Sequence, residues 1–130
     1  MRRFSFPIGV ALVLASAIAF AAPPLQKQGS FQPIAASGVT GDARALEMKA
    51  DTRVQGHIDN LVPGTVYQVV VSSDGNCTTD IAGATFSLTA NAAGKINFNQ
   101  LLVGTNISDV NSIRVVDPAG TELACTEQLL

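Results

Sequence analysis

The sequence NLVPGTVYQVVV, residues 60–71, carries the clearest sign of the fold. It places the pair Pro63-Gly64 directly before a segment in which Tyr67, Val69 and Val71 occupy every second position. A Pro-Gly pair favours a tight turn, and apolar residues at every second position are typical of a strand with one buried face. The stretch therefore predicts a corner of a β-sandwich, followed by a strand that packs on the core.

The same period of two continues on both sides of this stretch. Apolar and polar residues alternate within residues 46–50, 53–59, 84–90, 96–99, 113–115 and 123–125. In the first of these segments we expect the apolar residues Leu46, Met48 and Ala50 to face the core. Turn signals separate the segments, and no segment after residue 21 holds a helical period of 3.6. The pattern predicts an all-β Greek-key β-sandwich of about seven or eight antiparallel strands.

The composition excludes several classes of protein. The chain has 130 residues, of which 47% are hydrophobic and 14% are charged, and this suits one ordinary domain. One His and two Cys cannot build a zinc finger, a multi-histidine metal site or a disulfide-dense miniprotein. A formal net charge of −2 does not suit a protein that binds nucleic acid by neutralising phosphates.

The N-terminus has the three parts of a secretory signal peptide. A basic start, Met1-Arg2-Arg3, precedes an uncharged apolar run at residues 8–20, which ends in the small-x-small pattern Ala19-Phe20-Ala21. The alternative is a transmembrane anchor, but the run is shorter than the roughly 20 residues that a span needs. We therefore expect a cleaved signal at residues 1–21, no membrane span in the mature chain, and a periplasmic or secreted protein. Residues 22–33 are polar and proline-rich and predict a flexible leader, and residues 34–130 predict a single domain.

The two cysteines form the only pair that the chain can offer. In an oxidising compartment Cys77 and Cys125 favour a structural disulfide, which would stabilise the domain by roughly 4 kcal/mol in the chain-entropy model. The alternative is a redox-active pair, but such pairs usually lie two residues apart.

Two families contain a corner like that of residues 60–71. Fibronectin type III domains have L-x-P-G-x-x-Y, with the tyrosine hydroxyl bonded back to the corner. Copper–zinc superoxide dismutases have a similar corner before their first copper-binding strand. The rest of the chain, roughly residues 38–128, resembles the dismutases. Their G-x-C, A-G-G-H-F and L-A-C motifs are similar to GNC at 75–77, AGATF at 82–86 and LAC at 123–125, and VQGHI at 54–58 resembles the strand before the corner.

The chain departs from the dismutase pattern at the metal ligands. Where the resemblance implies copper histidines, this sequence has Val70, Ser72 and Thr85, and no histidine follows His57. The long metal-bearing loops are also missing. Copper and bridged zinc need several imidazoles, so the resemblance implies a dismutase-like pseudoenzyme without metal, cofactor or catalytic residues.

Few other residues indicate a site. Val66, Val70 and Val116 are apolar on faces expected to point outward and form a candidate interaction patch, unless neighbouring strands or the leader cover them. We expect His57 to be a solvated strand residue. Loop aspartates could form an oxygen-rich cation site, although solubilising carboxylates are the more common case. These aspartates are Asp59, Asp74 and Asp80.

Three hypotheses follow for the function. The first is an exported, non-catalytic dismutase-like protein of the cell envelope that binds an unknown protein or glycan. The second is a fibronectin type III or immunoglobulin-like adhesion or glycan-binding module. The third is a copper carrier or an enzyme with an unusual site, which the single histidine disfavours.

Overall fold

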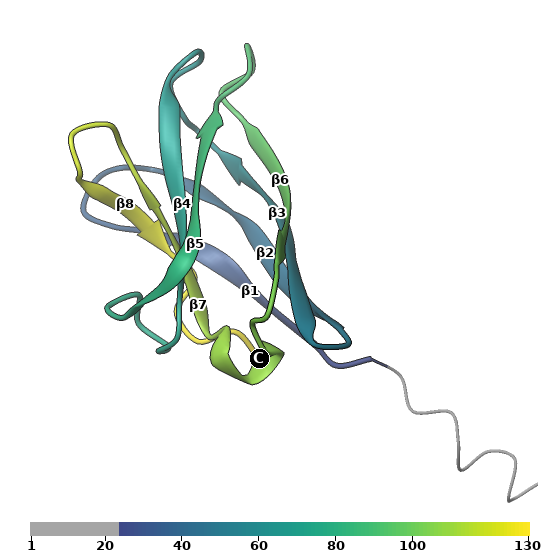
Figure 1. Ribbon diagram of the computed structural model, residues 1–130. Coiled ribbons are helices and arrows are strands. Elements are labelled where there is room, and N and C mark those ends of the chain that lie inside the picture. The colour runs from purple at the N-terminus through teal and green to yellow at the C-terminus, as the bar shows by residue number, and fades with distance from the viewer. Residues whose placement is uncertain (1–23) are drawn as a thin grey trace, which may run out of the picture.

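Eight antiparallel strands build the part of the chain that the computed structural model describes, residues 24–130 (Figure 1). The strands are β1 (Gln26–Pro33), β2 (Thr40–Met48), β3 (Asp51–Asp59), β4 (Val66–Ser72), β5 (Asp80–Thr89), β6 (Ile96–Leu102), β7 (Ser112–Val116) and β8 (Glu122–Cys125). One 3₁₀ turn, η1 (Ile107–Asp109), precedes β7. The all-β prediction is confirmed, while the predicted signal peptide at residues 1–21 lies outside the described residues.

The strands form one sheet in the order β5-β4-β7-β8-β1-β2-β3-β6. The sheet curls into a nearly closed, barrel-like layer, so that its two end strands approach each other without pairing (Figure 1). Three connections, residues 60–65, 90–95 and 103–111, lead to strands that are not neighbours in the sheet. The inner face of the curled sheet surrounds the core.

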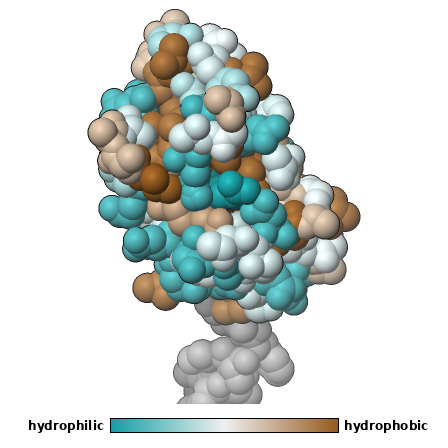
Figure 2. Space-filling model, turned by 90° about the vertical axis from the view of Figure 1, so that its left-hand side faces the viewer, coloured by the Kyte–Doolittle hydropathy of each residue, from teal (hydrophilic) through white to brown (hydrophobic). Residues whose placement is uncertain are grey.

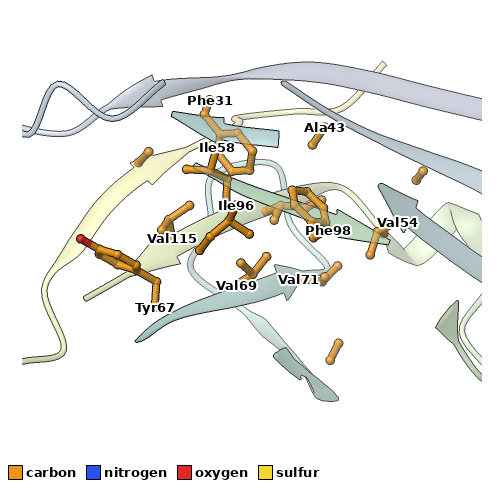
Figure 3. Packing of buried hydrophobic residues seen from close by; sticks show 14 of the residues in the cluster. Phe31, Ala43, Val54, Ile58, Tyr67, Val69, Val71, Ile96, Phe98 and Val115 are labelled. Atoms are coloured by element: carbon orange, nitrogen blue, oxygen red, sulfur yellow. The ribbon is translucent and has the colours of Figure 1, made fainter. Parts of the chain in front are cut away.

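The core contains the alternating residues of the 60–71 stretch. Tyr67, Val69 and Val71 are 3%, 0% and 0% exposed, as their spacing predicts. They point toward residues of the opposite strands, including Phe31 and Phe98 (Figure 3). The two phenylalanine rings meet edge to face, with centroids 6.4 Å apart.

The corner before β4 is closed by one hydrogen bond. The backbone N–H of Val62 donates to the Tyr67 hydroxyl oxygen at 2.9 Å, so the buried ring also has a polar partner. Gly64 has a φ of 78°, a conformation that glycine adopts at little cost, and this explains the Pro-Gly pair of the turn.

The prediction of a flexible leader at residues 22–33 is wrong for residues 26–33. Residues 26–33 form β1, which pairs with β2 along most of its length and with β8 at its end. Only one of its inward positions, Phe31, is a large apolar residue, so the alternation was hidden in the sequence. Another, Lys27, is half-buried, and burial lowers its pKa. Its ammonium donates to the Val110 carbonyl at 3.0 Å and to Asn111 Oδ1 at 2.9 Å. The ordered domain therefore includes the segment before residue 34.

The predicted facing of residues 46–50 is also wrong. Ala43 and Ala45 are the buried positions of β2, at 3% and 0% exposure, whereas Met48 is 43% exposed. The pairing explains the difference, because Ala43 lies opposite Gly56 and Ala45 lies opposite the buried Val54. In a strand, a register set one residue away moves every side chain to the other face.

Candidate functional site

Two of the three residues at the expected copper positions are buried beside a loop, whereas the third, Thr85 on β5, is exposed. On β4, Val70 and Ser72 are only 3% and 0% exposed, and residues 73–79 follow directly after them. The loop is tied to β8 by the predicted disulfide, Cys77–Cys125, which is present with the two Cα atoms 6.2 Å apart. We call this region, from residue 70 through the loop to the disulfide, the covered face.

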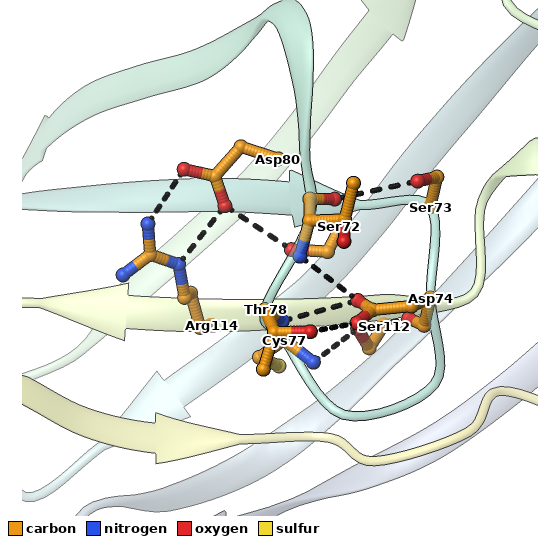
Figure 4. A network of polar contacts seen from close by, with 9 residues as sticks. Ser72, Ser73, Asp74, Cys77, Thr78, Asp80, Ser112 and Arg114 are labelled. Carbon is orange, nitrogen blue, oxygen red and sulfur yellow. Dashed lines mark hydrogen bonds and ion pairs between the residues drawn. The ribbon is translucent and has the colours of Figure 1, made fainter.

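Ser112 anchors the loop to the sheet. This fully buried side chain on β7 donates to the Asp74 carbonyl at 2.6 Å and accepts from the Cys77 N–H at 3.0 Å (Figure 4). One hydroxyl therefore satisfies two backbone groups that would otherwise lack partners.

The aspartates of this region are engaged by the protein itself. The Asp74 carboxylate accepts the Thr78 hydroxyl and the N–H groups of Thr78 and Thr79, and these hydrogen bonds, the Thr78 side chain first, lower its pKa. Asp80 pairs with Arg114 at 2.7 Å and accepts from the Ser72 hydroxyl at 3.4 Å (Figure 4). Within residues 24–130, no three side chains of His, Cys, Asp or Glu are grouped so that they could hold a metal ion.

The structure corrects the predicted interaction patch. Val66 is 49% exposed, but Val70 and Val116 are buried, at 3% and 6% exposure. These two valines are buried although they alternate with the core residues of their strands. On the side of the molecule drawn in Figure 2, hydrophobic residues stand in separate groups among hydrophilic ones.

A second region, on the outer face of β1, β2, β3 and β6, is hollowed and polar. A hollow of about 780 Å³ lies over the middle of these four strands. Its lining consists of two rows of outward side chains and the row between them. The first outward row is Gln28, Arg44, Gln55 and Asn99, and the second is Ser30, Asp42, His57 and Asn97. We call these eight residues the polar rows.

Three of the four residues that form the floor between the polar rows are small. The floor consists of Gly29, Ala43, Gly56 and Phe98, which are cross-strand neighbours. A Cβ on Gly56 would lie 2.1 Å from the Asp42 carbonyl oxygen and 2.8 Å from the Phe98 ring. Glycine is therefore required here, since no side chain fits between the backbone and the ring below.

Part of the hydrogen-bonding capacity of the rows is used within the protein. Gln55 Oε1 accepts from the Arg44 guanidinium at 3.0 Å, and Asp42 accepts from the Ser30 hydroxyl at 2.9 Å. Asn99 Oδ1 accepts from Arg53 at 2.7 Å. Within the described residues, no hydrogen bond engages the side-chain amides of Gln28 or Asn97.

The charges around the rows are balanced. His57 Nε2 lies 3.7 Å from Asp42 and 3.5 Å from Asp59, and Lys95 pairs with Asp59 at 3.2 Å. The His57 side chain is 42% exposed and is therefore in contact with solvent. It also lines the hollow. Such exposed pairs contribute little to stability.

Sequence reasoning identified one member of the polar rows, His57, and missed the other seven. Each of the seven is a polar residue at an outward position of its strand, and such residues alone indicate only a solvated face. Their convergence depends on the pairing of four strands from distant parts of the chain, including β1.

Neither of two comparisons with known proteins indicates a function for this chain. No protein-family model matches the chain. A search of curated proteins finds no match either. Among residues 24–130, none of the helical segments has the length and apolar character needed to cross a membrane.

Proposed function

We propose that this chain is an exported, non-catalytic binding protein of the cell envelope, built on a dismutase-like Greek-key β-sandwich without metal ligands. The observation that carries the proposal is the contrast between two outer faces of the sheet. Two of the three expected copper positions, Val70 and Ser72, are buried beside a disulfide-bonded loop, whereas the polar rows line an open hollow of about 780 Å³. A hollow of this volume lies within the range of ligand sites in proteins.

The topology and the disulfide support the family resemblance. A Greek key needs a strand that returns past a hairpin to lie beside an earlier one, and β6 lies beside β3 while β7 lies beside β4. The disulfide joins the loop after β4 to the last strand, as the positions of GNC and LAC imply in a dismutase-like chain. A stable disulfide also supports export, because reducing compartments disfavour such bonds.

One observation favours the second candidate, a fibronectin type III or immunoglobulin-like adhesion module. The hydrogen bond from the Val62 N–H to the Tyr67 hydroxyl has the form of a tyrosine corner. The Cys77–Cys125 bridge weighs against a fibronectin type III domain, which normally lacks it. Both candidates are binding proteins, so one experiment tests what they share.

The binding function is tested with cell envelopes from the organism that makes the protein. We expect the mature domain, labelled at its N-terminus, to bind isolated envelopes saturably in a sedimentation assay. The double variant Arg44→Ala/Asn97→Ala should lose this binding, and the matched variant Thr85→Ala/Ser87→Ala, exposed on β5, should keep it. Absence of saturable binding, or equal loss in both variants, contradicts the proposal.

The non-catalytic part of the proposal is tested by calorimetric titration with copper and zinc. We expect no stoichiometric binding to the mature domain, since one histidine cannot supply the imidazoles that either metal needs. Tight binding of one equivalent would overturn this part, and His57→Ala would then identify whether the single imidazole is a ligand.

A further inference from the structure

We infer that the ligand of the polar rows is a neutral saccharide that lies across β1, β2, β3 and β6. The inference rests on the proposed binding function and assigns a site and a chemical class to it.

The polar rows contain groups that can both donate and accept hydrogen bonds. Four of the eight side chains are carboxamides, each with two N–H donors and a carbonyl acceptor, and a fifth is the hydroxyl of Ser30. Saccharide hydroxyls are also donors and acceptors at once. The unengaged amides of Gln28 and Asn97 lie in different rows and on the outermost strands of the hollow, so they can bind a ligand at both sides.

The formal charges of the rows do not select for a charged ligand. The rows hold one guanidinium, Arg44, and one carboxylate, Asp42, which lie on the same strand in neighbouring rows. Beside them, Asp59 is paired with Lys95. An anionic ligand such as a phosphate would meet the Asp42 carboxylate, and a cationic ligand would meet the Arg44 guanidinium. A neutral ligand accepts from one and donates to the other.

The hollow also lacks the features of a protein-binding surface. Protein interfaces derive most of their affinity from aromatic or large apolar side chains that fill a pocket in the partner. None of the outward side chains of the polar rows is apolar, and Phe98 below them is only 4% exposed. The hollow is correspondingly open and shallow. It extends across four strands, a width of roughly 14 Å at the usual strand spacing. Such a surface suits a chain of hydroxyl groups better than a protein side chain.

Chemical treatment of the envelopes tests this assignment. Periodate cleaves the vicinal diols of saccharides, and proteinase K digests envelope proteins. We expect binding of the wild-type mature domain to be lost after periodate treatment and to persist after proteinase K. Arg44→Ala/Asn97→Ala should bind untreated envelopes at least about tenfold more weakly than wild type, since it removes two hydrogen-bonding groups of the site.

The two proposals fail in different ways. Binding that survives periodate overturns the saccharide assignment, and if it is then lost after proteinase K, the chain is a binding protein with a protein partner. Periodate-sensitive binding that Arg44→Ala/Asn97→Ala leaves unchanged overturns the assignment to the polar rows. No binding to untreated envelopes overturns the proposed function itself. Mock-treated envelopes with quenched periodate serve as the control for all arms.

Discussion

The two outer faces of the sheet use similar residues for opposite purposes. On the covered face, the hydroxyls of Ser72 and Ser112 are fully buried, and Ser112 holds a loop that the disulfide fastens to β8. On the opposite side, the polar rows point into an open hollow, and part of their hydrogen-bonding capacity is unused. Polar groups that are buried and bonded stabilise a fold, whereas exposed ones contribute little to it and are free to bind.

Of the changes that test the difference between the two faces, removal of the disulfide should have the largest effect. We expect Cys77→Ser/Cys125→Ser to lower the free energy of unfolding by roughly 4 kcal/mol, because the unfolded chain loses the constraint of a long loop. Urea denaturation of the mature domain measures the change. Reduction of the wild-type protein with a thiol should produce the same loss. Unchanged stability in both experiments would show that the bridge does not hold the covered face.

The buried serine of the covered face should have the next largest effect. Ser112→Ala leaves the Cys77 N–H and the Asp74 carbonyl without their partner, and we expect a loss of about 2 kcal/mol in unfolding free energy. The control is Ser87→Ala on β5, where the side chain is exposed. Equal values for the two variants would contradict the anchoring role of Ser112.

The covered face should also respond to acid through Asp74. Its pKa lies below the ordinary value of 3.8 in the folded protein, first because the Thr78 hydroxyl donates to the carboxylate. A group with a lowered folded pKa stabilises the protein above its unfolded pKa, and this contribution disappears as the pH falls through the folded value. We therefore expect the stability difference between wild type and Asp74→Asn to shrink as the pH falls below about 3.8. Chemical denaturation between neutral pH and pH 2.5 measures it, and a constant difference would contradict the expectation.

The smallest effect on stability is expected at the polar rows. Asn97→Ala should change the unfolding free energy by less than about 0.5 kcal/mol, since the side chain is exposed and engages no hydrogen bond within the described residues. The same variant should weaken binding to envelopes. A large loss of stability would remove the distinction between a structural and a binding face.

Burial was predicted correctly where the alternation of apolar and polar residues was clear. Tyr67, Val69 and Val71 are large and apolar, so their period of two was visible and their burial was predicted correctly. In β1, by contrast, the inward positions include Lys27 and Gly29, and nothing in their chemistry distinguishes them from a leader. Val70 and Val116 were placed on the surface because they alternate with core residues, and alternation does not show that an outward side chain is buried.

The sequence by itself determined the all-β class, the cysteine pair and the absence of a multi-histidine site, because each depends on residue type or local spacing. The tertiary structure alone decided that β1 belongs to the sheet, that Val70 is buried, and that eight polar residues from four strands line one hollow. The physical reason is that strand pairing joins residues distant in the chain, and the backbone hydrogen bonds that join them are the same for every sequence.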